Sequence, residues 1–404
     1  MTIRMDEGAA ELLDNLHRAG YAAYVVGGCV RDSLLGLTPH DWDLCTSALP
    51  QQGMELFGAE KCIPTGLQHG TVTVKQGGGL YEITTFRTEG TYTDGRHPDE
   101  VHFVPDVRED LARRDFTINA MAYNEKEGLV DPFGGQADLQ SGILRAVGVP
   151  HQRFTEDALR ILRLYRFAAR FGFAIDPPTA QAAQELCAHL DCVSVERIEE
   201  ELAKLLSAPA PAAYLDEKIL GVVLSELSPE ALAAAKPVVD ACPAGERALP
   251  VRLAALLLSL GEDGTRRALR RLRCSNACIE ETAVLVREVV SGVPVSLNIY
   301  TRKLLGQYGL KTVQRLAALG TALQPERSAD FAALSELAEQ LDADGVCCRV
   351  SQLAVNGRDL MAEGVPAGPG IRKVLEALLD GVIREEYPNE RQALLAAVQQ
   401  LAAS

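Results

Sequence analysis

The sequence of 404 residues contains no run of about 18 apolar residues, the length that a membrane-spanning helix needs. Its amino terminus, Met1-Thr2-Ile3-Arg4, lacks the pattern of a secretory signal. The ten cysteines are not spaced as a metal framework: Cys347 and Cys348 are adjacent, and no cysteine stands near a histidine at zinc-site spacing. These absences argue against a membrane protein, a secreted protein and a structural zinc site. They predict a cytoplasmic protein with buried, reduced thiols.

Positive charge is also in short supply. The chain has 55 Asp and Glu against 40 Lys and Arg, a net charge of −15, whereas nucleic-acid binding depends mostly on Lys and Arg contacts to phosphate. The arginines are clustered, however, with five in the eight residues from Arg266 to Arg273, where Leu269 and Leu272 suit a helix with one face on a core. Such a distribution limits nonspecific adhesion to RNA and favours an RNA recognised by its folded shape.

The chain is long enough for two to four domains. Strand signals are confined to residues 1 to about 146, and the remainder is rich in leucine and alanine with helical periodicity, interrupted by proline-bearing breaks such as Ala208-Pro209-Ala210-Pro211. We therefore predict an α+β protein with a small head that contains a mixed β-sheet, followed by an all-α neck, body and tail. The predicted boundaries are 1–146, 147–206, 207–300 and 301–404.

Two aspartates one residue apart, Asp41 and Asp43, follow a glycine-arginine turn. In an extended strand their carboxylates point to one face while Trp42 points to the other. Mg²⁺ prefers such oxygen ligands and keeps positions open for substrate phosphates. The spacing therefore suggests a metal site for phosphoryl chemistry, although an Asp-x-Asp pair also occurs in sugar-nucleotide transferases and in surface loops.

A phosphate-binding turn is predicted just before this pair. Tyr21 to Val26 reads as a strand, and Gly27 and Gly28 after it let the backbone approach a triphosphate closely. Arg31 would supply positive charge.

Glu82 is a candidate third acid. Gly70 to Val74 and Leu80 to Arg87 predict two strands joined by a glycine-rich turn, a hairpin signal. Acids are disfavoured inside strands, so Glu82 next to the Asp41 and Asp43 strand would complete a carboxylate triad. The alternative is an ordinary solvent-facing glutamate.

A base-selecting pair is predicted at Asp157 and Arg160. Three residues apart on a helix, they present an acceptor and a rigid donor fork on one face. Cytosine and adenine both offer an amino donor beside a ring nitrogen acceptor, so this pair could accept C and A and reject U and G. Glu156 is a candidate for steering the Arg160 guanidinium. An ordinary helix-surface ion pair is the alternative.

The same helix continues with Arg163, Arg166 and Arg170 beside an apolar face. Four arginines with no interleaved acid repel each other unless anions are near. We therefore predict that Arg160, Arg163 and Arg166 contact nucleotide or RNA phosphate, with a solvated charged face as the alternative.

Several motifs stand in the order of one known family. The segment from Gly27 to Gly36, with Asp41-Trp42-Asp43 after it, resembles the opening signature of the class II tRNA nucleotidyltransferases and bacterial poly(A) polymerases. The later matches are Arg113-Arg114-Asp115-Phe116-Thr117-Ile118-Asn119-Ala120, Asp131-Pro132-Phe133-Gly134-Gly135, Glu156-Asp157-Ala158-Leu159-Arg160, and Arg197 with Glu201. The resemblance implies that Arg113, Arg114, Asp115 and Asn119 bind the ribose and phosphates of the incoming nucleotide. It also implies that the Glu156 to Arg160 motif is a protein template that chooses the base.

The resemblance implies template-independent addition of C, C and A to the 3′ end of tRNA. CTP and ATP would be the substrates, Mg²⁺ the cofactor and pyrophosphate the leaving group. The expected partner is the acceptor and T arms of tRNA, because the tail from Val355 to Asn389 is similar to that of short bacterial CCA-adding enzymes. The loop Thr91 to Glu100 resembles the segment associated with switching from C to A addition.

Narrower activities remain open, since A-adding enzymes and poly(A) polymerases share these motifs. A catalytically dead RNA-binding module is disfavoured by the intact Asp41, Asp43, Arg114, Asp157 and Arg160. No histidine-aspartate pair stands near Leu256-Leu257-Leu258-Ser259, where some longer relatives might carry a hydrolase site. We therefore predict no hydrolase activity.

Overall fold

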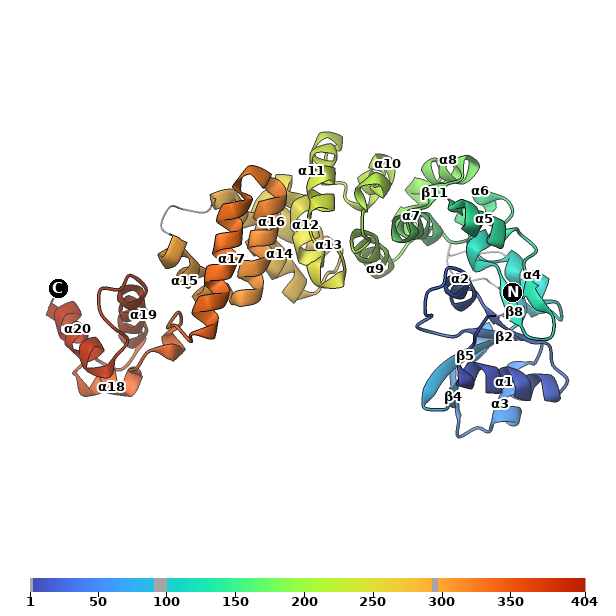
Figure 1. Ribbon diagram of the computed structural model, residues 1–404, viewed down its shortest axis with the longest axis horizontal. Coiled ribbons are helices and arrows are strands. Elements are labelled where there is room, and N and C mark those ends of the chain that lie inside the picture. Colours follow the sequence, from blue (N-terminus) through green and yellow to red (C-terminus); the bar gives the residue numbers. More distant parts are fainter. Residues whose placement is uncertain (1–2, 91–99, 293–296, 404) are drawn as a thin grey trace. The chain divides into compact units, whose positions relative to one another are not determined.

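The computed structural model describes residues 3–90, 100–292 and 297–403 (Figure 1). The chain divides into two compact units, Met1–Ser225 and Glu226–Ser404. The first unit contains all the strands in the described part of the chain, and the second is helical.

A seven-stranded mixed sheet forms the head of the first unit, which confirms the predicted fold class. Its strand order is β3-β4-β5-β2-β1-β8-β9. The pair β2 and β5 is parallel, and the other neighbours are antiparallel. The strands are β1 (Ala23–Val26), β2 (Leu44–Thr46), β3 (Cys62–Gly66), β4 (Thr71–Gln76), β5 (Gly79–Thr85), β8 (Ala122–Asn124) and β9 (Gly128–Val130). Two short strands, β6 (Arg87–Glu89) and β7 (Val101–Phe103), pair separately.

The sequence located the strands around the phosphate turn correctly. β1 falls inside the predicted Tyr21 to Val26 segment, and β4 and β5 form the predicted hairpin. Gly77 and Gly78 form its turn with φ of 55° and 85°, a conformation that glycine adopts without steric cost. The core beside β1 contains Tyr24, Val26 and Phe86, all less than 5% exposed.

Helices flank the sheet and continue beyond it. Those of the first unit are α1 (Glu7–Arg18), α2 (Gly28–Leu34), α3 (Pro50–Phe57), α4 (Val107–Ala112), α5 (Gly135–Ser141), α6 (Pro150–Glu156), α7 (Leu159–Phe171), α8 (Pro177–Glu185), α9 (Val195–Leu206) and α10 (Glu217–Val223). A 3-10 turn, η2 (Thr117–Asn119), follows α4.

The expectation that strands end near residue 146 is wrong by one short element. β11 (Ala174–Ile175) pairs in parallel with β10 (Ile143–Leu144). β11 stands between Gly172, which ends α7 in the left-handed conformation, and Pro177 at the start of α8. Two residues are too few to show the alternation that identifies a strand in a sequence.

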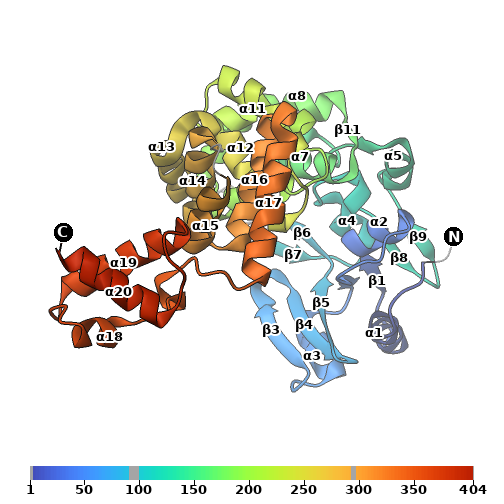
Figure 2. The same ribbon diagram turned by 60° about the vertical axis from the view of Figure 1, so that its left-hand side comes forward.

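The second unit consists of α11 to α20, and Figure 2 shows α16 and α17 packed side by side. The bounds are α11 (Pro229–Ala241), α12 (Leu249–Leu257), α13 (Gly261–Arg271), α14 (Asn276–Ser291), α15 (Leu297–Tyr308), α16 (Leu310–Leu323), α17 (Ser328–Ala343), α18 (Gly357–Ala362), α19 (Pro369–Ile383) and α20 (Arg391–Ala403). Leu269 and Leu272 are at most 1% exposed, as predicted for a helix docked on a core. A separate apolar cluster around Leu360, Leu378 and Leu394 joins the last three helices.

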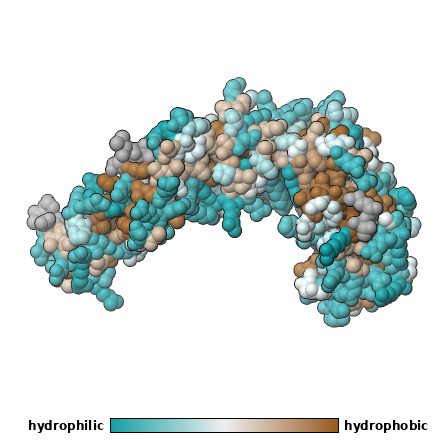
Figure 3. All heavy atoms as spheres, in the orientation of Figure 1, coloured by the Kyte–Doolittle hydropathy of each residue, from teal (hydrophilic) through white to brown (hydrophobic). Residues whose placement is uncertain are grey.

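Hydrophilic residues cover most of the face shown in Figure 3. Among the residues that the structure describes, no helix combines the length and apolarity needed to cross a membrane. None of the ten cysteines forms a disulfide, and eight are buried, as expected for reduced thiols; Cys192 is exposed and Cys278 is partly exposed.

Candidate active site

Asp41 and Asp43 present their carboxylates on one side of the chain, but they lie just before β2 rather than inside a strand. The chain at Asp43 is still bonded to β1, because the backbone N–H of Val26 donates to the Asp43 carbonyl at 2.9 Å. Both aspartates are exposed, whereas Trp42 is only 8% exposed. The predicted alternation therefore holds without a regular strand.

Glu82 lies beside Asp43. The parallel pairing of β2 and β5 sets Leu44 opposite Ile83, so the two acids precede this buried pair on the exposed face. Asp43 is exposed as a residue, yet the protein atoms around its carboxyl group reduce its hydration. This desolvation raises the pKa of Asp43, and the negative charges of Glu82 and Asp41 raise it further, while Arg114 opposes them. The three acids therefore interact through space.

This carboxylate group fits a hard divalent cation. Its ligands are oxygens, and a cation would relieve the repulsion that raises the pKa of Asp43. In the described part of the chain, no group of three or more His, Cys, Asp or Glu side chains could hold a metal ion by itself. Water and substrate phosphate would therefore have to complete the coordination, as is usual for Mg²⁺.

Arg114 lies against the phosphate turn with unused donor capacity. Gly27 has φ of 77°, and a β-carbon at this position would stand 2.8 Å from Arg114 Nη1. Arg114 Nε is buried without a hydrogen-bond partner in the described structure. Its ion pair, from Nη2 to Asp110 Oδ2, is long at 3.5 Å. A buried donor without a partner costs stability, so Arg114 is suited to receive an anionic ligand.

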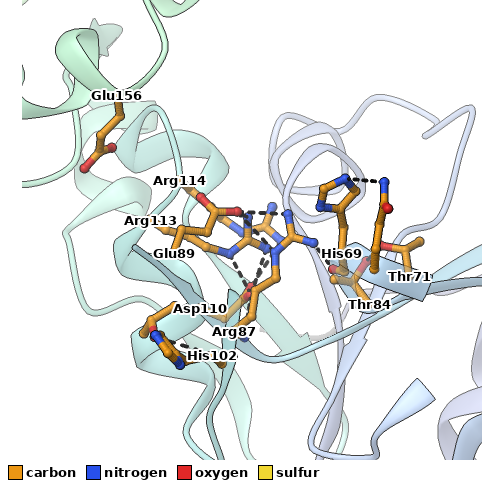
Figure 4. A network of polar contacts seen from close by, with 12 residues as sticks. His69, Thr71, Thr84, Arg87, Glu89, His102, Asp110, Arg113, Arg114 and Glu156 are labelled. Carbon is orange, nitrogen blue, oxygen red and sulfur yellow. Dashed lines mark hydrogen bonds and ion pairs between the residues drawn. The ribbon is translucent and has the colours of Figure 1, made fainter. Parts of the chain in front are cut away.

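Arg113, by contrast, is fully engaged by protein acids (Figure 4). Asp110, which is fully buried, accepts from Arg113 Nε at 3.0 Å and Nη2 at 2.8 Å, and Glu89 accepts from Nη1 at 3.0 Å. Burial alone would raise the pKa of Asp110, but Arg113 and Arg114 outweigh it and hold the pKa below its usual range. Asp110 therefore fixes the two arginines of the second motif relative to each other.

Arg31 is also enclosed rather than open. It is 4% exposed, and its Nε donates to Asp32 at 2.8 Å while Nη1 donates to Asn119 at 2.6 Å. Its guanidinium carbon stands 5.2 Å and 4.9 Å from the ring centres of Phe167 and Phe171. Burial lowers the pKa of Arg31, and Asp32 opposes that shift. The structure therefore surrounds the predicted phosphate contact with protein groups.

Asp115 and Asn119 connect this region to α7. Asn119 Nδ2 donates to Asp115 Oδ1 at 3.0 Å, and Arg163 donates to Asp115 Oδ2 from Nε at 2.9 Å and from Nη2 at 2.6 Å. Burial would raise the pKa of Asp115, but Arg163 and Asn119 reverse the effect and lower it well below its usual range. The structure thus brings Arg31, Asp115, Asn119 and Arg163 into one connected network.

The prediction that Asp157 and Arg160 share one helical face is wrong. α6 ends at Glu156, and Asp157 is extended with φ of −143° and ψ of 103°. Its carboxylate accepts the backbone N–H of Leu159 at 3.0 Å, because a short Asp side chain readily bonds the backbone two residues ahead. The same carboxylate accepts from Arg197 Nη2 at 2.8 Å.

Arg160 is the second residue of α7, and its guanidinium donates to other groups of the protein. Its Nη1 donates to Glu156 at 2.8 Å, so the predicted contact with Glu156 is present. Its Nη2 donates to the carbonyl of Arg113 at 3.0 Å, which ties the base-selecting motif to the second motif. Asp157 and Arg160 are therefore positioned by different partners.

The arginines of α7, namely Arg160, Arg163, Arg166 and Arg170, are paired with carboxylates of the protein itself. Arg166 pairs with Glu201 at 2.5 Å and lies 3.9 Å from the ring centre of Phe167. Arg170 pairs with Asp32 at 3.3 Å. Contact of these arginines with phosphate stays a prediction.

Sequence reasoning missed Asp32, Glu89 and Asp110. A signal existed for Asp110, which precedes Arg113 and Arg114 by three and four residues, the spacing of helical ion pairs. Glu89 gave no comparable signal for Arg113, which comes from a distant segment, and Asp32 stands next to Arg31, a spacing at which helical side chains do not face each other. The loop Thr91 to Glu100 lies, apart from Glu100, outside the described residues.

Three family profiles match the chain. The profile described as Poly A polymerase head domain matches residues 23–145. The profile for a probable RNA and SrmB-binding site of polymerase A matches residues 172–219, and that for a putative tRNA nucleotidyltransferase domain 2 matches residues 251–398.

Curated relatives match over nearly the whole chain. The CCA-adding enzyme of Lactiplantibacillus plantarum is 37% identical over 96% of this chain and 95% of its own length. That of Geobacillus stearothermophilus is 36% identical over 96% and 95%. The crystal structure of Bacillus stearothermophilus CCA-adding enzyme in complex with CTP has a TM-score of 0.83 at 32% identity and covers 99% of this chain and 98% of that chain. The Thermotoga maritima CCA-adding enzyme complexed with tRNA shares the fold, with a TM-score of 0.69 at 22% identity over 98% and 94%.

Proposed function

Because the chain belongs to the family of CCA-adding tRNA nucleotidyltransferases, we propose that the site around Gly27 performs its nucleotidyl transfer. The observation that carries this proposal is one juxtaposition. On one side, the charges of Glu82 and Asp41 act on the desolvated Asp43 carboxyl group; on the other, Arg114 places Nη1 at Gly27 and has a buried Nε without a hydrogen-bond partner in the described structure. A cation with phosphate oxygens would satisfy both sides at once. The activity is addition of C, C and A to the 3′ end of tRNA, with CTP and ATP as substrates.

Arg114 and the phosphate turn would hold the triphosphate. The backbone at Gly27 and Gly28 can approach phosphate closely, and the Arg114 fork can donate to its oxygens. Asp115 and Asn119 would orient the ribose side of the pocket through their fixed network. The 3′ oxygen of tRNA would then bond to the α-phosphorus and release its proton to water. The bond between the α-phosphorus and the oxygen that bridges it to the β-phosphorus breaks, and pyrophosphate leaves with that electron pair.

The family is typically metal-dependent, and we propose Mg²⁺ as the ion, with Asp41 and Asp43 as ligands and Glu82 nearby. When bound, the ion would lower the pKa of the attacking hydroxyl and offset charge on the phosphates. Desolvation raises the pKa of Asp43, and the charges of Glu82 and Asp41 raise it further; a bound cation would oppose both effects, which supports this assignment.

Base choice is assigned to Asp157 and Arg160. Arg160 is held by Glu156 and by the Arg113 carbonyl, and Asp157 by Arg197, so neither side chain needs to be ordered when the nucleotide binds. This preorganisation supports a protein template that accepts C and A. Arg113, Arg163 and Arg166 would support the pocket from their fixed positions.

We also propose that the head, neck, body and tail divide the work at residues 146, 206 and 300, with the tail contacting the acceptor and T arms of tRNA. We propose that the protein acts in the cytoplasm, where its proposed substrates tRNA, CTP and ATP are found.

The decisive experiment uses three RNAs with Mg²⁺, CTP and ATP: tRNA lacking CCA, tRNA ending in CC, and an unstructured RNA. The proposed enzyme completes the first two and stops, because a pocket that holds the growing 3′ end has finite room. Extension of the CC-ended tRNA alone would instead identify an A-adding enzyme. Repeated extension of the unstructured RNA would identify a poly(A) polymerase.

A further inference from the structure

Side chains of the protein connect α2, which follows the phosphate turn, to α7, the helix that carries Arg160 and that we call the base-selecting helix. α2 follows the turn directly and carries Arg31 and Asp32, and α7 begins next to Arg160 and carries Phe167, Arg170 and Phe171. These five residues, which we call the clasp, contact one another between the two helices.

The clasp has an aromatic part. The Arg31 guanidinium faces both Phe167 and Phe171, whose rings are stacked with centres 6.1 Å apart and an interplanar angle of 4°. Phe167 is 5% exposed and the Arg31 side chain is also 5% exposed, so water competes little with this cation–π contact. A guanidinium can stack on a ring and donate in its own plane at the same time, whereas an ammonium cannot.

The clasp also has an ionic part. Asp32 accepts from Arg31 Nε through Oδ1 and pairs with Arg170 through Oδ2, so one buried carboxylate serves both helices. Arg170 in turn lies 5.0 Å from the ring centre of Phe171. Asp32 thus offsets part of the charge of Arg31 and Arg170, and no contact in the clasp requires substrate.

The clasp stands at a position that can set the register of α7. Phe167 follows Arg160 by seven residues, which is two helical turns and about 10 Å along the axis. Arg31 follows Gly28 by three residues, one turn from the phosphate turn. The distance between a bound triphosphate and the base-selecting Arg160 therefore depends on how α2 sits against α7.

We propose that Arg31 and Asp32 are positioning residues that clasp the base-selecting helix to the phosphate turn and so set base discrimination. This proposal rests on the proposed function, since discrimination is measured on nucleotide addition. If the clasp contacts are weakened, the triphosphate contacts stay in place, but α7 can shift and Arg160 can contact the wrong bases. The effect is therefore on selectivity rather than on phosphate binding.

The test compares single-nucleotide addition of CTP and UTP to tRNA lacking CCA by Phe167→Leu, Arg31→Lys and the matched control Phe173→Leu. Phe173 belongs to the same aromatic cluster, 5.5 Å from Phe171, but has no cation–π contact with Arg31. We expect Phe167→Leu and Arg31→Lys each to lower the ratio of kcat/KM for CTP over UTP by about three- to tenfold. Phe173→Leu should keep the wild-type ratio, and pyrophosphate should inhibit all four proteins equally.

Unchanged discrimination in Phe167→Leu, or an equal loss in Phe173→Leu, would overturn the clasp. So would a wild-type ratio in Arg31→Lys, because it would mean that positive charge alone suffices. Should Phe167→Leu fail to fold, Arg170→Met tests the ionic part of the clasp in its place, since Arg170 is 43% exposed and the substitution removes its ion pair with Asp32. Failure of the proposed function is distinguishable, because the wild-type protein would then add no C to tRNA at all.

Discussion

The carboxylates of the first unit fall into two regions that differ in how their charge is balanced. At the mouth of the sheet, Asp41, Asp43 and Glu82 repel one another, and the pKa of Asp43 is raised. Between the sheet and α7, Asp110 and Asp115 are paired with arginine, and their pKa values are lowered. The difference indicates where ligands bind. Acids that repel one another without an arginine partner among the described residues, which we call the unbalanced region, are expected to bind a cation. Acids paired with arginine, which we call the balanced region, hold other side chains in place.

Removing an acid from the unbalanced region should have the largest effect. We predict that Asp43→Ala loses addition of both CTP and ATP, because a metal ligand contributes several kcal/mol to the transition state, which is about a thousandfold in rate. Binding of tRNA should persist, as measured by gel shift alongside turnover with Mg²⁺. Measurable turnover in this variant would remove the metal role and with it the contrast between the regions.

The two regions should respond oppositely to neutralisation at neutral pH. Asp115→Asn should destabilise the protein by about 3 kcal/mol, because it removes the close ion pair with Arg163 at 2.6 Å and leaves Arg163 the longer one with Glu201 at 3.8 Å. Asp43→Asn should stabilise it, since a carboxyl with a raised pKa pays for its charge in the folded state.

Chemical denaturation from pH 7 to pH 2 checks both signs. The stability that Asp115 contributes is complete above the ordinary aspartate pKa of about 4 and is lost as pH falls towards its lowered pKa. The penalty at Asp43 is present above its raised pKa and disappears as pH falls through it. Both differences from wild type should therefore shrink on acidification, and differences independent of pH would contradict the assigned charges.

Base selection should depend on Asp157 and Arg160, whose charges are also paired within the protein, with Arg197 and Glu156 respectively. Asp157→Ala and Arg160→Ala should each cost about 1 to 3 kcal/mol of discrimination, the value of a lost bidentate base contact. The assay is incorporation of all four nucleotides onto tRNA that ends at the discriminator base. If both variants kept the preference for C and then A, the protein-template assignment would be wrong.

The smallest effect is expected where arginines have no acid partner. On α13, Arg266 pairs with Glu262 and Arg271 with Glu226, whereas Arg267 and Arg270 are exposed and make no ion pair within the described residues. Each of Arg267→Ala and Arg270→Ala should lower the slope of log K for tRNA against log salt by about 1. Arg271→Ala is the matched control and should change the slope less. Equal slopes in all three variants would contradict the expectation that arginines without an acid partner bind RNA phosphate.

The sequence predicted the parts of the site that depend on local order. Gly27 and Gly28 after a strand, and the alternation of Asp41 and Asp43 about Trp42, are both present. Glu82 lies beside Asp43, as predicted, because β5 pairs in parallel with β2. The hairpin register, which follows from its turn and its alternation, sets only the face of the sheet on which Glu82 lies. Roles in catalysis stay predictions.

The sequence could not predict which arginines are occupied. Arg31, Arg113 and Arg163 were expected to contact the nucleotide, yet their donors meet Asp32, Glu89, Asp110 and Asp115. The pairs Arg113–Glu89 and Arg163–Asp115 join segments far apart in the chain, so helical spacing carries no information about them. Asp32 and Asp110 are close in sequence to their arginines, but spacing alone does not show that such pairs occupy the arginine donors. The break at Asp157 was missed for a local reason, since the Asp side chain competed with the helix for a backbone N–H.

The most direct test of the central claim is the effect of Mg²⁺ on thermal stability, measured for the wild type, Asp43→Asn and Asp115→Asn. A cation at Asp41 and Asp43 relieves repulsion only in the folded protein, so Mg²⁺ should raise the Tm of the wild type and of Asp115→Asn. It should leave the Tm of Asp43→Asn nearly unchanged. An equal rise in all three proteins, or no rise in the wild type, would contradict the account.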